Sequence, residues 1–398
     1  MSEQLKIRID NYKSKALLVT IMLFMISLQN HGVFPWLVGF AISFIYFFLY
    51  KNKHYYTNII ALFFCIFLIA LFSLKLFIID FDIVHPVTFE SYNNNVLFFL
   101  LLALFSYAVS VILKDANDIS VFSSAIKNVA SIHMLAFILQ FFVVNVTGYY
   151  IDFIFPFTGE ESRYLNYFSS IVDGVQQYRV TGLYVEPSTF VGAMFALITL
   201  RLVNNKFSYG WFELIGILCM ALTFSTAGMA LSLALMLLLL SQKTSTSFLK
   251  KIFKIIALFF ILALMFIYFD FEKSYLKALG TYDIRLDLLL KPFWREGLGY
   301  YLGYGPFGME TELYNAATDN VDGRRVAAVH DVGTLVFLML QFGIMGAIIY
   351  IGMLLPFRKI GYVLLIFLLF TLTKISVFHP IFIFLYIFLI NNRRLYGR

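Results

Sequence analysis

The chain has 398 residues, of which 61% are hydrophobic and 13% are charged, and its mean hydropathy is +0.84. A water-soluble domain carries about a quarter charged residues, so this composition excludes an ordinary soluble fold. The net charge of +7 would suit nucleic acid. The basic residues instead flank apolar runs, where they set membrane orientation. Basic side chains at the membrane surface can also interact with anionic lipid headgroups. We therefore expect an integral membrane protein and no nucleic-acid partner.

The N-terminal segment combines basic residues with an apolar run. Lys6, Arg8, Lys13 and Lys15 precede the apolar stretch that begins at Ala16. A secretory signal peptide has this arrangement, but no small-x-small cleavage site follows, and a second apolar run begins at Gly32. The pattern therefore favours a retained first helix.

Apolar stretches long enough to cross a bilayer recur along the whole chain. About twelve spans are expected, near residues 16–30, 32–50, 57–79, 96–113, 126–146, 183–200, 209–224, 227–240, 252–269, 332–355, 361–377 and 379–390. Residues 225–228 barely separate the seventh and eighth spans, and the last span is short and follows His379-Pro380. Either pair could be a broken or re-entrant helix. The predicted fold is all-α, with residues 1–398 forming a single polytopic membrane domain.

The distribution of Lys and Arg predicts the orientation of these spans. Most Lys and Arg residues fall at the two ends of the chain and in every second connection between spans. Because basic connections stay in the cytoplasm, both termini are predicted to be cytoplasmic. The opposite set contains two long outer loops, residues 147–182 and 270–331. These loops carry most of the polar residues outside the spans and are the predicted location of the functional site.

The first outer loop is rich in Tyr and Phe and leads into Arg179, Glu186 and Pro187. Its aromatics suit an interfacial belt, the commoner use, or a surface on which sugar rings pack. Pro187 fits the first turn of the sixth helix. Ionisable groups at membrane depth are costly, so Arg179 and Glu186 are functional candidates. The structural alternative is an ion pair between them, or an interaction of Glu186 with the helix N-terminus.

The second outer loop contains several arginines, a glycine cluster and His330. Arg285, Arg295, Arg324 and Arg325 could each bind phosphate with two hydrogen bonds, although an arginine in a wet loop is usually only solvated. The glycine cluster, residues 297–308, lacks the Walker spacing and predicts a tight turn.

The six histidines and two cysteines of the chain show no metal-binding pattern, and His330 alone is a candidate functional residue. His330 can exchange a proton near neutral pH at the head of a span, or it can be structural. The remaining histidines are scattered without ligand spacing, so no metal is predicted. Cys65 and Cys219 lie in apolar runs and are expected to be core or lipid-facing residues.

The order of these motifs resembles that of the O-antigen polymerase (Wzy) family and of the related O-antigen ligases. The motifs are Arg179-x-x-Gly182-Leu-Tyr-x-Glu186-Pro-Ser188 before a helix, Arg285 early in the late outer loop, Gly303-x-Gly305, and His330 before a span with Gly343 and Gly346. The likeness covers about residues 178–350. Asp331 departs from the ligases, which have Asn or another polar residue after the histidine.

The resemblance implies a GT-C-like, metal-independent glycosyltransferase in the bacterial inner membrane. Such an enzyme joins undecaprenyl-diphosphate-linked oligosaccharide repeats at the periplasmic face and needs no cofactor. By the same resemblance, Arg179 and Arg285 bind the donor diphosphate, and His330 or Glu186 is the catalytic base. Asp331, Tyr184 and Ser188 are the supporting residues. Membrane lipids and a chain-length regulator protein are the implied partners.

Two alternatives to a polymerase remain open on the sequence. An O-antigen ligase would transfer the finished glycan to a lipid A core, and Glu186-Pro187 favours the polymerase over it. A transporter or flippase of lipid-linked oligosaccharides would place charges at the bilayer midplane and often has related halves. The charges in the predicted spans, Lys75, Glu213 and Lys374, stand towards helix ends and could snorkel to the surface. An enzyme is therefore the preferred interpretation.

Overall fold

The computed structural model of the protein describes residues 3–28, 33–50, 89–113, 116–159, 161–162, 178–241, 256, 258–262, 288–303, 320–321, 324–325 and 333–392. These parts are almost entirely helical, as predicted. Apart from turns and connecting loops, the described residues contain one short antiparallel pair of strands, β1 (Asn320–Val321) and β2 (Arg324–Arg325). The predicted span near 57–79 and most of that near 252–269 lie outside the described residues.

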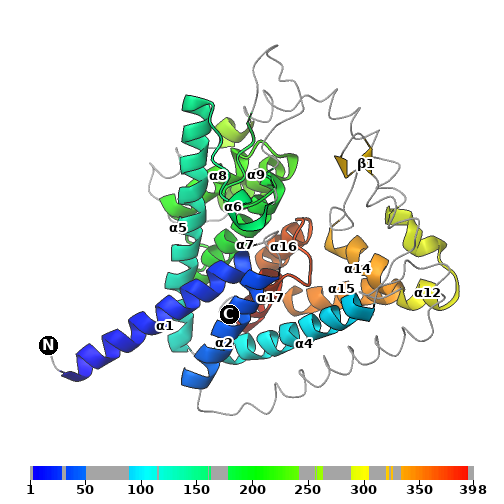
Figure 1. Ribbon diagram of the computed structural model, residues 1–398, viewed down its shortest axis with the longest axis horizontal. Helices are drawn as coiled ribbons and strands as arrows, with labels where there is room; N and C mark the ends of the chain where they lie inside the picture. The colour runs from blue at the N-terminus through cyan, green and yellow to red at the C-terminus, as the bar shows by residue number, and fades with distance from the viewer. Residues whose placement is uncertain are drawn as a thin grey trace.

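The helices form a bundle with a smaller group of helices beside it (Figure 1). The bundle consists of α1 (Glu3–Ser27), α2 (Phe34–Tyr50), α4 (Phe89–Ile112), α5 (Ala116–Thr147), α6 (Phe155–Thr158), α7 (Pro187–Asn204), α8 (Trp211–Ala221), α9 (Thr226–Ser241), α16 (Gly361–Thr371) and α17 (Pro380–Asn392). The smaller group consists of α12 (Gly297–Leu302), α14 (Thr334–Phe342), α15 (Ile344–Leu354) and the 3-10 turn η2 (Leu355–Phe357).

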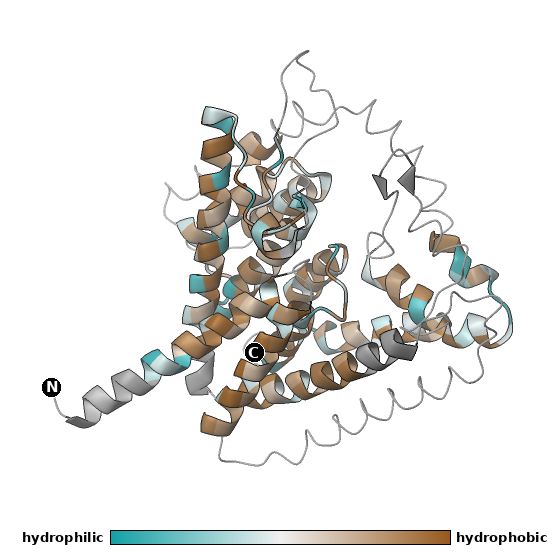
Figure 2. Cartoon of the chain, viewed as in Figure 1, coloured by the Kyte–Doolittle hydropathy of each residue, from teal (hydrophilic) through white to brown (hydrophobic). Residues whose placement is uncertain are grey.

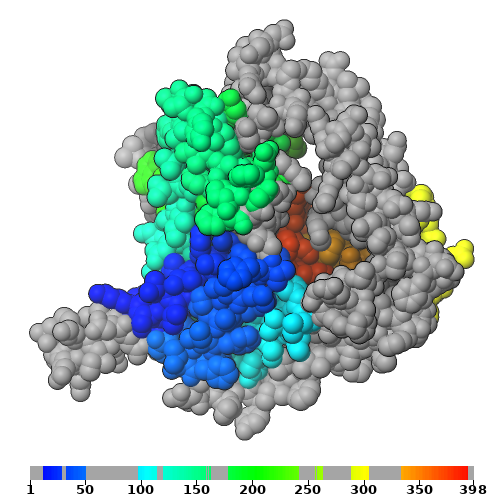
Figure 3. Space-filling model, viewed as in Figure 1, coloured from blue at the N-terminus to red at the C-terminus, as the bar shows by residue number. Residues whose placement is uncertain are grey.

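The first two helices form an antiparallel hairpin. The Ser14 and Tyr50 hydroxyls lie 3.2 Å apart at one end of it, and the Trp36 indole N–H donates to the Leu28 carbonyl at the other, 2.8 Å away. At Gly39 the absence of a side chain lets α2 approach Ile26 of α1. On the face shown in Figure 3, α2 (blue) lies beside both α1 (dark blue) and α4 (cyan). The hairpin therefore packs as part of the bundle.

Helix α7 is the central helix of the bundle. It contacts α5, α8, α9, α16 and α17, and nearly all of its side chains are buried. Helices α5 and α7 are the two described helices that are long and apolar enough to cross a membrane. One side of α5 exposes apolar residues at helical spacing: Ile132, Leu135, Leu139, Phe142 and Val146. Figure 2 shows that hydrophobic residues cover most of the remaining helices as well.

Several predicted helix boundaries agree with the structure and others do not. Helices α1, α4 and α5 begin well before the predicted spans 16–30, 96–113 and 126–146. The predicted seventh and eighth spans are separate helices, α8 and α9, joined by a turn in which the Thr223 and Ser225 hydroxyls lie 2.9 Å apart. The predicted span 361–377 ends at Thr371, and residues 372–379 form a non-helical connection to α17. The predicted single span 332–355 is two helices, because the chain breaks at Gly343.

Two glycines build the break between α14 and α15. Gly303 and Gly343 both have positive φ, +61° and +58°, and their backbones are in direct contact. A Cβ on Gly343 would lie 2.7 Å from the Gly303 nitrogen, closer than any real Cβ contact. Gly303 ends α12, so the described part of the glycine cluster, residues 297–303, forms a short helix with a glycine end. Residues 304–308 of the cluster lie outside the described residues.

Arg295 holds the same junction from the side. Its Nη1 donates to the carbonyls of Leu340 and Met339 at the end of α14, at 2.8 and 3.4 Å. The side chain is 7% exposed, so the expectation of a merely solvated arginine is wrong. A cation is favourable there because the last carbonyls of a helix carry partial negative charge. Arg324 and Arg325 lie in β2, and only their backbone is described.

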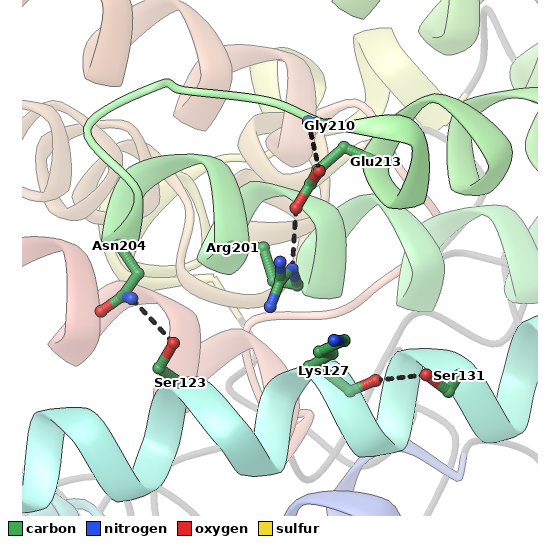
Figure 4. Close-up of polar contacts among 7 residues, drawn as sticks. All are labelled: Ser123, Lys127, Ser131, Arg201, Asn204, Gly210 and Glu213. Carbon is green, nitrogen blue, oxygen red and sulfur yellow. Dashed lines mark hydrogen bonds and ion pairs between the residues drawn. The ribbon is translucent and has the colours of Figure 1, made fainter.

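A buried ion pair fixes the far end of α7. Arg201 Nε donates to Glu213 Oε1 of α8 at 2.8 Å, and Glu213 Oε2 accepts from the Gly210 nitrogen at 2.7 Å (Figure 4). The Asn204 amide donates to Ser123 of α5. The Glu213 side chain is only 2% exposed. It therefore does not snorkel to the surface as expected but joins α7 to α8.

Replacing Glu213 by alanine should lower the free energy of unfolding by about 3 kcal/mol, because the Arg201 guanidinium would stay buried without its carboxylate. Chemical unfolding of the purified full chain would measure this. Glu296→Ala, at an exposed position, is the control and should change the free energy by less than about 0.5 kcal/mol. Equal stability of the two variants would contradict the role given to the pair.

Candidate functional site

The loop that enters α7, residues 179–186, is anchored by Gln140 of α5. The Gln140 Oε1 accepts hydrogen bonds from the backbone nitrogens of Thr181 and Gly182, at 3.0 and 2.8 Å. Its Nε2 donates to the carbonyl of Ile151, at 2.6 Å. Gln140 is fully buried, and buried backbone groups require such partners. One side chain therefore ties together the two ends of the loop that was predicted to be the first outer loop.

The start of the first outer loop is organised by Asp152. Its carboxylate accepts hydrogen bonds from the backbone nitrogens of Ile154, Phe155 and Ser162 and from the Ser162 hydroxyl. Burial would raise the pKa of Asp152, but these hydrogen bonds outweigh burial and hold its pKa below the ordinary value. The Tyr150 hydroxyl lies 2.7 Å from that of Thr181. The described part of the loop is thus packed against residues 179–186.

Tyr184 supports the loop from the interior of the bundle. Its ring is fully buried, and its hydroxyl donates to the Ser27 carbonyl at 3.0 Å. The His133 ring stacks on it at 5.4 Å, and His133 Nε2 lies 2.8 Å from the Ser27 hydroxyl. The predicted supporting role of Tyr184 is therefore a positioning one. Sequence reasoning missed His133, because its partners come from α1 and from the loop before α7, both distant from it in the sequence.

Glu186 is the residue at which α7 begins. It has extended backbone angles, and Pro187 occupies the first helical position, as predicted. Its carboxylate makes no hydrogen bond to the helix N-terminus. Oε2 instead accepts from Lys374 Nζ at 2.9 Å and from the Ser188 hydroxyl at 3.3 Å. Glu186 therefore stands at the helix N-terminus, as one of the two structural alternatives expects, but without a capping hydrogen bond from its side chain.

Arg179 lies at the start of the loop and interacts electrostatically with Glu186. Burial lowers the pKa of its guanidinium from the ordinary value, and the Glu186 carboxylate opposes that shift. An arginine still keeps its charge, because its ordinary pKa lies far above neutral pH. Its Nε is buried and finds no hydrogen-bond partner among the described residues. The guanidinium thus retains donor capacity for a ligand.

Lys374 reaches Glu186 from the non-helical connection between α16 and α17. The absence of a side chain at Gly192 lets this connection lie on α7, because a Cβ there would come 2.8 Å from Ile375. The Thr373 and Ser376 hydroxyls accept from the backbone nitrogens of Ile375 and Phe378, which partly satisfies the irregular backbone. Lys374 does not snorkel as expected. It forms a tertiary ion pair with a residue 188 positions away.

The connection also borders the beginning of α14. A Cβ on Gly333 would lie 3.3 Å from the Thr371 carbonyl oxygen. Phe378 packs edge-on against Phe99 of α4 and Phe337 of α14, with ring centroids 4.7 and 5.7 Å apart. The start of α14 is therefore attached to the connection that supplies Lys374.

The structure brings together Arg179, Glu186 and Ser188 of the predicted site and adds Lys374. Arg285, His330 and Asp331 lie outside the described residues. A signal for Lys374 was present, because an ionisable residue between two apolar runs is a functional candidate. Within the described ranges, no three His, Cys, Asp or Glu side chains gather as a potential metal-ion site. Cys219 is buried in the core, one of the two environments expected for it.

Comparisons with models of protein families, with curated proteins and with solved structures find no match to this chain.

Proposed function

We propose that the protein is a polytopic inner-membrane glycosyltransferase of the O-antigen polymerase type. The observation that carries this proposal is the cluster of Arg179, Glu186 and Lys374 where α7 begins. It unites two cations and one carboxylate next to the aromatic first outer loop. Guanidinium and ammonium groups bind phosphate oxygens, so the cluster suits the diphosphate of a lipid-linked sugar.

The exposed surface of α5 supports the membrane location. Its apolar stripe, Ile132 to Val146, would be unfavourable in water, whereas lipid chains would cover it. Trp211, half exposed at the start of α8 near Arg201, suits the membrane interface. The proposal keeps about twelve spans, both termini in the cytoplasm, and the Arg179 cluster at the periplasmic face.

The proposed reaction joins two lipid-linked oligosaccharides. A hydroxyl of the acceptor sugar loses its proton to the base, and its oxygen attacks the anomeric carbon of the donor. The bond from that carbon to the diphosphate breaks, and undecaprenyl diphosphate leaves with the electron pair. Arg179, together with Arg285, stabilises the charge that develops on the leaving diphosphate.

The ion pair of Glu186 bears on the choice of base. The Glu186 carboxylate already accepts a hydrogen bond from Lys374, and this ion pair would be lost if the carboxylate took up a proton. We therefore assign the base to His330 and an electrostatic role to Glu186. His330 is three residues before Gly333, and three residues span at most about 11 Å. Gly333 borders the connection that carries Lys374, and this short distance along the chain supports the assignment of the base to His330.

Deletion of the gene followed by gel analysis of cell-surface glycans tests the function. A polymerase mutant should carry a single repeat unit on each lipid core, because ligation continues without polymerisation. Accumulated polymer that is not attached to the lipid A core would indicate the ligase instead. An unchanged ladder of chain lengths would reject both glycosyltransferase assignments.

A further inference from the structure

We infer that the protein binds an anionic phospholipid where α7 ends, next to the ion pair of Arg201 and Glu213. The headgroup phosphate lies at Lys127 of α5 and at Lys206 of the turn between α7 and α8. The acyl chains lie on exposed apolar side chains of α5 and α8. This inference goes beyond the proposed reaction, but it rests on the proposed membrane location.

The packing of α5 on α7 places Lys127 beside the end of α7. The Asn204 amide donates to the Ser123 hydroxyl at 2.9 Å, and Gln140, further along α5, bonds to the loop before α7. The two helices are therefore antiparallel. Lys127 follows Ser123 by one helical turn on the same face of α5. Arg201 precedes Asn204 by about one turn, so it lies at the level of Lys127. Figure 4 shows the Lys127 side chain directed towards α7, on the side where Arg201 lies.

Helix α8 brings Trp211 to the same end of the bundle. Glu213 of α8 is paired with Arg201, whereas a Cβ on Gly216 would meet Ile198, one turn earlier in α7. Helix α8 is therefore antiparallel to α7 and parallel to α5, which it also contacts. Trp211 stands two residues before Glu213, and about half of its side chain is exposed. An exposed indole at this level suits the headgroup region of a membrane.

The charges at this end of α7 favour an anionic headgroup. Lys127 is exposed, and no Asp or Glu stands within four residues of it in the sequence. Lys206 is exposed as well, and its φ of +51° shows that the turn holds it in a backbone conformation that lysine rarely adopts. Arg201 and Glu213 neutralise each other. The two lysines therefore attract a phosphate, and a headgroup that carries its own ammonium is attracted less.

Exposed apolar side chains continue from Lys127 towards the middle of the membrane. On α5 and α8 they are Ile132, Leu135, Leu139, Phe142, Val146 and Ile215. At 1.5 Å per residue the helix from Lys127 to Val146 is about 29 Å long, close to the thickness of the hydrocarbon core. Lys127 therefore lies at one membrane surface when α5 crosses the bilayer, the cytoplasmic surface in the proposed orientation. A phospholipid has the matching order, a charged headgroup followed by apolar chains.

Quenching of Trp211 fluorescence by brominated lipids tests the inference. The purified full chain is reconstituted in phosphatidylcholine vesicles that contain increasing fractions of dibrominated phosphatidylglycerol or, for comparison, dibrominated phosphatidylcholine. The difference in emission between wild type and Trp211→Phe isolates Trp211 from the other two tryptophans. Phosphatidylglycerol should bind beside Trp211 about tenfold more tightly than phosphatidylcholine, because two lysines face its phosphate.

Lysine variants separate a defined site from diffuse attraction to a basic surface. Lys127→Gln should lower the preference for phosphatidylglycerol about fivefold, and adding Lys206→Gln should abolish it. Lys127→Arg keeps the charge and should keep the preference. Lys359→Gln, which removes an exposed lysine from the connection after η2, is the matched control and should leave the preference unchanged. An equal loss in Lys127→Gln and Lys359→Gln, or no loss in the double variant, would overturn the inference.

Failure of this inference is distinguishable from failure of the proposed function. Equal quenching by the two brominated lipids would leave the membrane location intact and overturn the lipid site. Absence of quenching by either lipid would overturn the membrane location and the lipid site together. A preference for phosphatidylglycerol, combined with unchanged surface glycans after gene deletion, would leave the lipid site standing while the polymerase is wrong.

Discussion

Replacing Arg179 by alanine should reduce glycan polymerisation by on the order of 100- to 1000-fold, with the protein still inserted and folded. The guanidinium is buried beside Glu186, and its Nε lacks a hydrogen-bond partner in the described part of the chain. Its removal leaves the carboxylate paired with Lys374, so the fold keeps that interaction. What is lost is the positive charge that stabilises the leaving diphosphate in the proposed reaction. The length distribution of surface glycans in a deletion strain carrying the variant measures the effect.

The controls for Arg179→Ala separate charge from position. Arg179→Lys keeps the charge but loses the paired donors of the guanidinium, so it should retain partial activity. Arg358→Ala removes an exposed arginine after η2 and should give wild-type chain lengths. Wild-type polymer from Arg179→Ala, at equal protein level, would refute the assignment of Arg179 to the site.

The start of α7 at Glu186-Pro187 could be predicted well because its signals are local. Proline tolerates the first helical turn and disfavours a helical residue before it, so Glu186-Pro187 marks the start of α7. Ionisable residues at the edge of an apolar run indicate a site without any knowledge of tertiary structure. Hydropathy, which is also a local signal, predicted the bounds of α8, α9 and α17 within a few residues.

The contacts that complete the site could not be predicted, because they join distant segments. Lys374 and Glu186 are 188 residues apart, and hydropathy gives no information on which lysine meets which carboxylate. The fixation of residues 179–186 depends on Gln140, a residue that appears in the sequence as one polar position in an apolar helix. Nor does any local pattern reveal that Arg295 is buried at the end of α14.

Replacing Gly343 by valine should lower the free energy of unfolding by about 4 kcal/mol or more. A β-branched residue at φ +58° is strained by about 1–3 kcal/mol. Its Cβ would also meet the Gly303 nitrogen and the Tyr300 carbonyl, and overpacking adds about 1–3 kcal/mol. Chemical unfolding of the purified variant measures the loss.

The same substitution should also reduce polymerisation, because the break at Gly343 sets the direction of α14 and His330 precedes that helix by four residues. Gly352→Val is the matched control in α15, since no atom lies within 4 Å of a Cβ built there and its φ is ordinary. It should change the free energy of unfolding by less than about 1 kcal/mol. If Gly343→Val were as stable as Gly352→Val, the two-glycine contact would not hold the junction. If Gly343→Val were destabilised but fully active, the direction of α14 would be irrelevant to the reaction, and His330 would lose its place as the base.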